Sequence, residues 1–565
     1  MFASVLEPKT AVVLLGVAVF CNLAIKYWQA RAAYHKTQKS GECQHHLPPK
    51  YPSMIPYWGV VVPFVWDTPA FLQNVTSYAG RLTSLRITVA PFRDIFLFQD
   101  QETIKEIWKN SIMMCAGRVH IWALRYLFGF PEKWLAQYAA DDSGPFLKPY
   151  PGSNVEPHLR IHRLLNHSID KALTGPGFGP TLQRFRTAML DQIEGLGTSD
   201  DNEWMEIDDL RRLVHNTVGR SLINALFGPH ILQINSTLMD DLYEFDQALP
   251  WFARRIPKFI MPGIYACRSR LHRQFKVWYT YARTHFKESD INEDGDGDPY
   301  WGSNWMRERQ KALDIIQDDD ALAAGDLGVA WASIANVVSA STMALVHVSN
   351  TPDLAASVQD EVRKIFGHQS LAEVDLKKLS NIPLLASIYA ETLRLHGKSF
   401  TVVSSPVQDI HLGRYRLPKN AMGLINAHVS HMDDGFWNTK NGIHPVGSFW
   451  PQRFLTDPND PHSGPTRVPR PLVKPQDADS KEVSFSLQGL EAAWIPYGGG
   501  HLICPGRFLA KNVIIFTISL LTRDFDIEVL THEVKFSKRW FGFGIELPKH
   551  AIPIRIRRKC VESPK

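Results

Sequence analysis

The sequence predicts a mainly α-helical protein with a small β region. Residues 321–348 are apolar on most faces and contain no proline, which is typical of a buried helix that crosses a domain. Residues 384–393 and 508–521 form two further apolar helical runs. Residues 550–559 alternate isoleucine with proline and arginine, as a half-buried strand does.

Composition narrows the class of protein. The chain has 565 residues, of which 44% are hydrophobic and 11% aromatic, so a substantial core is expected. The net charge of +5 is modest, so no nucleic-acid partner is expected. The six cysteines lack CxxC spacing, which argues against a zinc site or a disulfide scaffold and favours a reducing compartment. No flavin or nicotinamide fingerprint is present, so electrons for a redox reaction would come from a separate protein.

The N-terminus carries a candidate membrane anchor. Residues 11–25 are apolar except for Asn22, and a basic stretch and a proline-rich segment follow them. This pattern predicts a membrane anchor in residues 1–30, a basic and proline-rich hinge in residues 31–60, and one large domain in residues 61–565. The positive charge after the apolar run places that domain on the cytosolic side. A cleaved signal peptide is the alternative, although no A-x-A site follows closely.

The most informative motif is Tyr-Gly-Gly-Gly-His-Leu-Ile-Cys-Pro-Gly-Arg at residues 497–507. It sets Cys504 behind a glycine-rich bend and just before an apolar helical run. Backbone N–H groups and the helix dipole lower the pKa of a thiol at such a position, so the motif predicts a thiolate that binds a metal. The glycines let the backbone lie close to a flat cofactor. A buried structural cysteine is the alternative.

This motif resembles the haem-ligand loop of the cytochrome P-450 superfamily, whose pattern is met by Tyr497, Gly500, Cys504 and Gly506. The resemblance implies the cytochrome P-450 fold: a single haem domain behind an N-terminal transmembrane helix. It also implies haem b, with Cys504 as the axial thiolate. Tyr497 replaces the usual phenylalanine, and leucine occupies position 502, where an arginine or histidine often contacts a haem propionate. Arg163 is the expected substitute for that contact.

A carboxylate and two arginines match a second family motif. Glu391 and Arg394 lie one helical turn apart, and Arg453 follows in the segment Phe-Trp-Pro-Gln-Arg-Phe. By resemblance, the three residues lock the structural core that supports the Cys504 loop. In isolation such residues would form solvated ion pairs of little value.

Small residues interrupt the long helix in its middle. Ala332, Asn336 and Ala340 share one stripe, which leaves room for a ligand beside the helix, although close helix packing is the alternative. In the family this stretch forms the oxygen-binding groove, with Asn336 at the position of the acid and Val337 at the position of the threonine. Valine has no hydroxyl with which to relay a proton.

The proton relay therefore has several candidate sources. Ser333 and Ser341 lie four residues either side of Val337, Asn336 could order a water, and a substrate hydroxyl could serve. The string Trp-Ala-Ser-Ile-Ala-Asn is similar to the branch of the family that contains the sterol 7α- and 12α-hydroxylases and prostacyclin synthase. That branch includes both monooxygenases and an isomerase.

The resemblance implies a membrane-bound cytochrome P-450 monooxygenase. It would use haem iron, O₂ and reductase-supplied electrons to hydroxylate or oxidise a lipophilic, sterol- or terpenoid-like molecule, with secondary-metabolite biosynthesis as the expected setting. Two alternatives stay open: an isomerase of a lipid peroxide, and a non-catalytic haem-binding membrane protein. The expected donor is NADPH-cytochrome P-450 reductase, with cytochrome b5 as an optional second donor. The expected location is the endoplasmic reticulum membrane, with a single span and a cytosolic catalytic domain.

Substrate contacts are expected by resemblance from four places: residues 115–138, Ala332, residues 399–404 and residues 541–545. Residues 290–295 begin like an EF-hand calcium loop, but tryptophan stands at the twelfth position, where a bidentate glutamate is needed. The run from residue 288 to residue 298 is therefore interpreted as a solvated acidic loop between helices.

Overall fold

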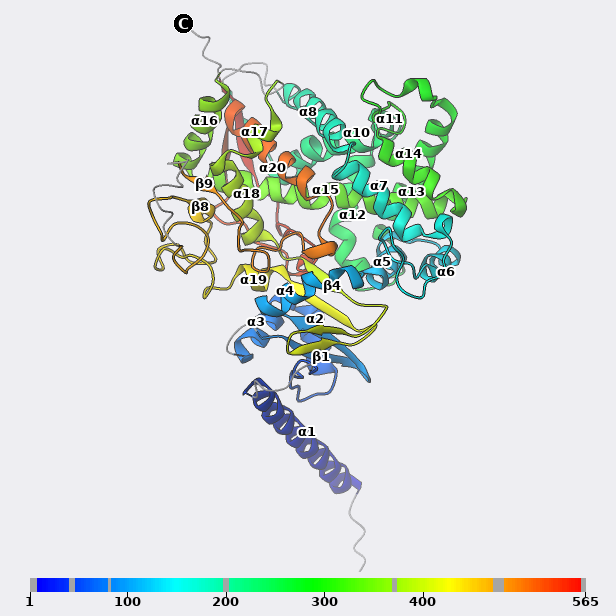
Figure 1. The fold of residues 1–565 in the computed structure, drawn as a ribbon, viewed down its shortest axis with the longest axis vertical. Helices are drawn as coiled ribbons and strands as arrows, with labels where there is room; N and C mark the ends of the chain where they lie inside the picture. The colour runs from blue at the N-terminus through cyan, green and yellow to red at the C-terminus, as the bar shows by residue number, and fades with distance from the viewer. Residues whose placement is uncertain are drawn as a thin grey trace, which may run out of the picture. The chain divides into compact units, whose positions relative to one another are not determined.

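The computed structural model describes residues 8–39, 46–79, 83–196, 203–367, 373–470 and 482–559. The chain forms two compact units, whose elements are labelled along the ribbon in Figure 1. The first comprises Met1–Cys115, Phe400–Ser430 and Gly500–Leu502, and the second comprises Ala116–Ser399, His431–Gly499 and Ile503–Lys565.

The first unit combines the N-terminal helices with most of the β structure. Its helices are α1 (Pro8–Lys39), α2 (Trp58–Trp66), α3 (Thr68–Ala79), α4 (Gln101–Lys109), η1 (Ser111–Met113), α19 (Ala427–His431, whose last residue belongs to the second unit) and η8 (Gly500–Leu502). Its strands are β1 (Leu85–Ala90), β2 (Arg93–Phe98), β4 (Phe400–Val403), β5 (Ile410–Leu412), β6 (Tyr415–Leu417) and β7 (Met422–Asn426).

A four-stranded sheet in the order β1-β2-β7-β4 organises this unit. The pairs β1/β2 and β4/β7 are antiparallel, whereas β2 and β7 are parallel. Leu85 and Ile87 are fully buried while Arg86 between them is half-buried, which is the alternation expected of a strand with one covered face. Helix α1 contains a 24-residue stretch, Val12–His35, that is long and apolar enough to cross a membrane.

The second unit is almost wholly helical. Its helices are α5 (Gly117–Ala123), η2 (Leu124–Phe128), α6 (Glu132–Ala140), η3 (Pro157–Leu159), α7 (Ile161–Leu173), α8 (Phe178–Glu194), α9 (Leu210–Val214), η4 (His215–Gly219), α10 (Arg220–Phe227), α11 (Pro229–Ile234), α12 (Leu238–Ala253), α13 (Pro262–His285), η5 (Glu288–Asp290), α14 (Asn304–Ala312), η6 (Asp314–Ile316), α15 (Asp319–Ser349), α16 (Pro352–Phe366), α17 (Leu376–Ser380), α18 (Pro383–His396), η7 (Pro451–Phe454), α20 (Arg507–Asp524) and η9 (Lys538–Trp540). Its strands are β3 (Met205–Ile207), β8 (Leu455–Thr456), β9 (Ser484–Phe485), β10 (Phe525–Val529) and β11 (Ile554–Arg558).

Helix α15 is the central element of the second unit. It packs against α13, α18, α20 and η4, among other elements. Its one buried acid, Asp326, accepts hydrogen bonds from Arg309 Nη2 at 2.6 Å and from the Tyr279 hydroxyl at 2.8 Å, so the charge is neutralised inside the core. The predicted helix at residues 321–348 is therefore confirmed, and the burial of α15 identifies it as a core helix although its length and hydropathy would also suit a membrane span.

The other predicted elements are also present. The apolar runs at residues 384–393 and 508–521 lie in α18 and α20. The alternating C-terminal segment forms β11, the middle strand of the antiparallel sheet β10-β11-β3, with Ile554 and Ile556 on its buried face. The mainly α fold with a small β region is thus as expected.

Candidate active site

Cys504 lies three residues before the first residue of α20, where the chain leaves the glycine-rich bend. Its backbone N–H donates to the Tyr497 carbonyl at 2.9 Å. Its own carbonyl accepts from Arg507 Nη1 at 3.0 Å, which fixes the segment at the helix start. The backbone is therefore held at both sides of the sulfur, and Cys504 is one of the free cysteines.

The electrostatics of Cys504 differ from the sequence-based expectation. Burial raises the pKa of the Cys504 thiol, and the N–H groups of Gly506 and Arg507 and the Arg507 charge offset that rise only in part. The expected lowered pKa is therefore wrong for the free thiol, because desolvation outweighs the helix terminus. Cys504 is nevertheless accessible. A coordinated metal would deprotonate this accessible thiol directly.

The buried Tyr497 hydroxyl has a hydrogen-bond partner on α18. The Tyr389 hydroxyl on α18 donates to the Tyr497 hydroxyl at 2.9 Å. Burial raises the pKa of both phenols, so both stay neutral. Where phenylalanine would only pack, this pair ties the Cys504 loop to α18. Sequence reasoning missed Tyr389, because a lone tyrosine two residues before Glu391 carries no motif.

Gly500 belongs to the first unit, where only glycine suits its position. It has a φ of +55°, and a Cβ built there would lie 2.3 Å from Ser111 Oγ and 2.8 Å from the Trp108 carbonyl. The neighbouring His501 N–H donates to Ser111 Oγ at 2.9 Å. Gly506 has an ordinary φ of −77°, and a Cβ there would sit 3.8 Å from Cys504 Sγ, against the sulfur.

The three predicted core residues form one fully buried cluster in the second unit. Glu391 accepts from Arg394 Nε at 2.7 Å and Nη2 at 2.8 Å, from Arg453 Nε at 3.2 Å and from the Trp450 N–H at 3.1 Å. All three charged side chains have an exposed fraction of 0%. Arg394 also donates to the His431 carbonyl at 2.8 Å. A solvated surface pair is therefore the wrong interpretation, and the cluster joins α18 to η7.

The middle of α15 is accessible along one stripe. Val329, Ala332, Ser333, Asn336 and Val337 are half-buried or exposed, whereas most of their neighbours are buried. These positions recur at intervals of three and four residues, so they lie on one face of the helix. A helix packed on its other faces but open here borders a space that a ligand can enter.

The candidate relay residues differ in what they can do. The Ser333 hydroxyl lies on the stripe and donates to the Val329 carbonyl at 2.8 Å. Ser341 is fully buried, and its hydroxyl has no hydrogen-bond partner among the described residues. Ser341 shares the helical face of Ser333 and Val337 by its spacing, but it is not accessible as they are, because neighbouring elements cover the helix beyond Val337. The Asn336 side-chain oxygen accepts from the Ile545 N–H at 2.9 Å, which uses one of its two lone pairs.

The two arginines near the start of α7 have different surroundings. Arg160 is buried and donates to Ser143 Oγ at 3.0 Å and to the carbonyl of Leu147 at 2.8 Å, so it is committed to that loop. Arg163 is half-buried and makes no hydrogen bond or ion pair to the described residues. A half-buried cation of this kind suits an anionic group such as a haem propionate.

These features fit a haem-thiolate site in three independent ways. The Cys504 thiol is accessible, an uncommitted arginine is available for a carboxylate, and the central helix opens along one stripe. Asp326, the one carboxylate within α15 beyond its first turn, is buried and accepts hydrogen bonds from Arg309 and Tyr279.

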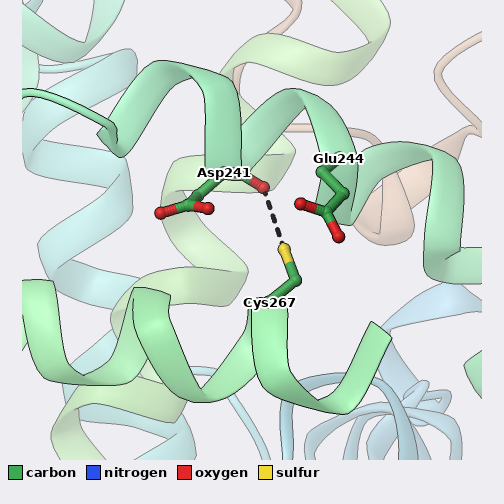
Figure 2. Close-up of side chains that lie close together, drawn as sticks. All are labelled: Asp241, Glu244 and Cys267. Atoms are coloured by element: carbon green, nitrogen blue, oxygen red, sulfur yellow. Dashed lines mark hydrogen bonds between the residues drawn. The ribbon is translucent and has the colours of Figure 1, made fainter. Parts of the chain in front are cut away.

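A cysteine and two carboxylates lie together elsewhere in the second unit, as Figure 2 shows. Cys267 on α13 donates its thiol proton to the Asp241 carbonyl at 3.3 Å, and burial raises the pKa of Cys267 to about 12. Arg270 pairs with Asp241 at 2.7 Å and with Glu244 at 2.8 Å. A protonated thiol and paired carboxylates make poor metal ligands, so this cluster is a helix-to-helix contact.

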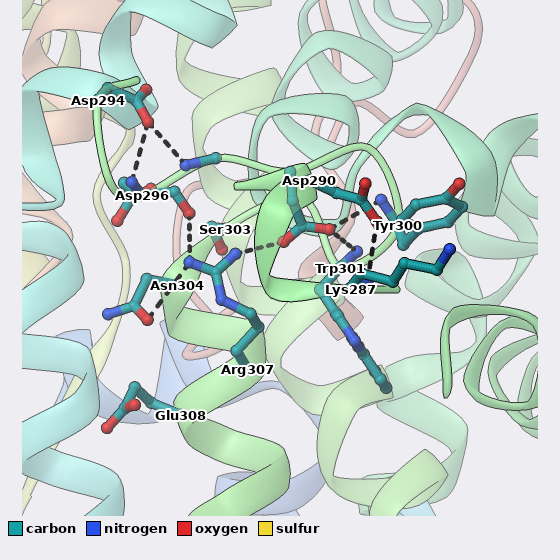
Figure 3. A network of polar contacts seen from close by, with 12 residues as sticks. Lys287, Asp290, Asp294, Asp296, Tyr300, Trp301, Ser303, Asn304, Arg307 and Glu308 are labelled. Atoms are coloured by element: carbon teal, nitrogen blue, oxygen red, sulfur yellow. Dashed lines mark hydrogen bonds and ion pairs between the residues drawn. The ribbon is translucent and has the colours of Figure 1, made fainter. Parts of the chain in front are cut away.

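The acidic segment before α14 is exposed over residues 292–295, as the sequence suggested, but its last residues fold into the protein (Figure 3). Asp296 and Asp298 are buried, and Arg184 pairs with Asp296 at 2.6 Å while Arg307 pairs with Asp298. Asp294 accepts the N–H groups of Asp296 and of the following glycine at 2.9 and 3.0 Å. The carboxylates therefore fold the loop around two arginines. The interpretation as a calcium site stays unsupported, since their oxygens are already committed.

Comparisons with known proteins agree with this geometry. The family model "Cytochrome P450" matches residues 208–553. The cytochrome P450 monooxygenase efuG of Hormonema carpetanum is 30% identical over 96% of this chain and 95% of that protein. The cytochrome P450 monooxygenase fsoE of Humicola fuscoatra is 28% identical over 99% and 96%. The 7-alpha-hydroxycholest-4-en-3-one 12-alpha-hydroxylase of Oryctolagus cuniculus is 26% identical over 71% and 76%.

Proposed function

The chain belongs to the cytochrome P450 family and is a haem-thiolate monooxygenase; from this premise we propose that it hydroxylates or otherwise oxidises a polycyclic lipophilic molecule of the sterol or terpenoid kind. The single observation that carries the proposal is the accessible, uncharged stripe of α15 in the same unit as Cys504. Two similar proteins whose names state a sterol substrate support the same class. Secondary-metabolite biosynthesis is the proposed setting.

The residues of the chain have separate tasks in this proposal. When bound, haem b supplies an iron centre that activates O₂ for insertion of one oxygen atom into the substrate. Cys504 holds the iron through its thiolate, and Arg163 pairs with a propionate. Glu391, Arg394 and Arg453 keep the supporting core rigid. Ser333, with its hydroxyl on the stripe, is the side chain placed to pass a proton toward a ligand there.

The electron source and the location follow from the sequence and are part of the proposal. A redox partner must reduce the enzyme; we propose NADPH-cytochrome P-450 reductase, with cytochrome b5 as a second donor. Residues 1–30 would anchor the protein in the endoplasmic reticulum membrane, residues 31–60 would form a hinge, and residues 61–565 would be the cytosolic catalytic domain. The exposed apolar stretch Val12–His35 supports the anchor.

The test is product analysis under ¹⁸O₂. Membranes that contain the protein and a reductase are incubated with a panel of sterols, terpenoids and lipid peroxides. We expect NADPH-dependent incorporation of one ¹⁸O atom into a sterol or terpenoid, and no incorporation with Cys504→Ser. Oxidation of lipids outside both classes would overturn the proposed substrate class.

A second candidate activity, isomerisation of a lipid peroxide, is favoured by one observation. Val337 occupies the accessible stripe without a hydroxyl. An unlabelled, rearranged product formed without NADPH would support this activity. The variant Val337→Thr separates the two: if proton delivery limits oxygen insertion, the added hydroxyl raises the yield of product per NADPH, whereas an isomerase gains nothing.

A further inference from the structure

The turn at residues 541–545 is attached to the accessible stripe of α15 through Asn336. The Asn336 side-chain oxygen accepts the Ile545 N–H at 2.9 Å, a contact between residues 209 positions apart. Because the backbone N–H can only donate, the oxygen of the amide must face the turn. The contact joins the stripe to a segment that sequence resemblance places among the substrate contacts.

Gly544 and Asn336 are matched in shape. Gly544 has a φ of +148°, and a Cβ built there would lie 1.9 Å from the Asn336 oxygen and 2.8 Å from its Cγ. Only glycine therefore lets the amide reach the backbone of the turn. The amide occupies the volume that any side chain at position 544 would need.

Other contacts hold the remainder of the turn. The Lys398 N–H donates to the Gly544 carbonyl at 2.8 Å, and Trp540 Nε1 donates to the Ile545 carbonyl at 3.0 Å. The Glu546 N–H donates to the His396 carbonyl at 2.9 Å. These contacts keep the turn attached from the side of α18, so loss of Asn336 would free only the edge that faces α15.

We propose that Asn336 is a positioning residue that fixes the turn at residues 541–545 against the open stripe of α15 and thereby sets which carbon of the substrate is oxidised. The effect on the site of oxidation rests on the proposed function, whereas the positioning of the turn by Asn336 does not. A turn held at a hydrogen-bond distance from the stripe defines one wall of the space that a lipophilic substrate enters. A turn released there would admit the substrate in more than one orientation.

Hydrogen exchange measures the positioning directly, without turnover. The full-length protein is solubilised, and exchange is followed in peptides that contain Ile545. Asn336→Leu has a similar size but no acceptor, so we expect exchange at Ile545 to rise about tenfold, the loss expected for one net hydrogen bond. Asn336→Asp keeps an acceptor and should preserve the protection. Ser333→Ala, on the same stripe but without contact to the turn, is the matched control and should leave the exchange unchanged.

A double-mutant cycle tests the match of shapes. Gly544→Ala should lower Tm by several degrees in the native background, through collision with the amide and through backbone strain. In the Asn336→Ala background the collision is absent, so the same substitution should cost clearly less. Equal costs in the two backgrounds would overturn the pairing, as would unchanged exchange at Ile545 in Asn336→Leu.

The product distribution tests the second half of the proposal. In an active preparation, Asn336→Leu should change the ratio of hydroxylated isomers and raise KM more than it lowers kcat, while Asn336→Asp stays near the native ratio. Faster exchange with an unchanged isomer ratio would overturn the link to regiochemistry. Failure of the proposed function is distinguishable, because the native protein would then oxidise no lipid although the exchange experiment still gives its result.

Discussion

Two polar regions of the second unit, the cluster around Glu391 and the stripe of α15, differ in charge, burial and hydrogen bonding. The cluster around Glu391 is charged and fully buried, and its carboxylate accepts four hydrogen bonds. The stripe of α15 is uncharged and accessible, and it makes few side-chain contacts. Buried charges whose hydrogen bonds are all made give rigidity. If one partner moves, the other is left as an unpaired buried charge, which costs several kcal/mol of stability. Neutral side chains that each make a single hydrogen bond keep capacity for a ligand.

The largest effect should come from breaking the buried cluster. Glu391→Gln removes the charge that compensates Arg394 and Arg453, both of which are fully buried. We expect a loss of about 3–5 kcal/mol in the free energy of unfolding, seen as low yield and early thermal denaturation. Asp360→Asn, in an exposed ion pair with Arg363, should change stability by less than about 0.5 kcal/mol. Similar losses in the two variants would contradict the assignment.

The pair of buried phenols should show the next largest effect. Tyr389→Phe leaves the Tyr497 hydroxyl buried without its partner and should cost about 1–3 kcal/mol of unfolding free energy. Tyr389→Phe combined with Tyr497→Phe removes both hydroxyls, so the double variant should be more stable than the single one. Chemical denaturation of the four proteins measures the coupling. Strict additivity would show that the two hydroxyls do not interact.

Acidification should weaken the end of α15. His347 contacts His396 at 2.7 Å, and His396 contacts Glu546 at 2.8 Å. Burial lowers the pKa of both imidazoles below 6.5, His347 strongly and His396 against an opposing contribution from Glu546. Below pH 6.5 the unfolded chain therefore binds protons that the folded protein does not. Each imidazole should then cost about 1.4 kcal/mol of stability per pH unit until its folded pKa is reached.

The variant His347→Gln isolates this contribution. It should reduce the slope of stability against pH between 6.5 and 5 by about the share of one imidazole, because the distant buried histidines titrate equally in both proteins and only His396 loses a neighbour. The measurement is the denaturation midpoint across that pH range. An unchanged slope would mean that His347 does not resist protonation in the folded state.

Two serines on α15 should show the smallest effects. Ser333→Ala removes a hydroxyl bonded only to its own helix and should change stability by less than about 0.5 kcal/mol. Ser341→Ala removes a buried hydroxyl without a partner among the described residues, so it should be neutral or stabilising by up to about 1 kcal/mol. Thermal denaturation compares them. A clear destabilisation by Ser341→Ala would reveal a partner for that hydroxyl.

Much of the fold could be predicted from the sequence, because a long apolar segment is expected to be buried wherever the chain folds. The helices at residues 321–348 and 508–521 and the strand near the C-terminus were expected and are present. The burial of Asp296 and Asp298 at the end of the acidic run was not predicted, because charge alone does not reveal that Arg184 and Arg307 fold back onto it. The burial of Ser341 was not predicted either, because helical spacing gives a face but not what covers that face.

The sequence by itself determined the family, the cysteine, the three residues of the charged cluster and the central helix, since each is encoded in local spacing. Only the tertiary structure decided the net pKa shift of Cys504, the partner of Tyr497 and the contact of Asn336 with Ile545. Those properties depend on residues that lie more than a hundred positions apart or on the protein packed around a group. Desolvation and hydrogen bonding depend on which groups are close in space, and a local sequence pattern does not contain that information.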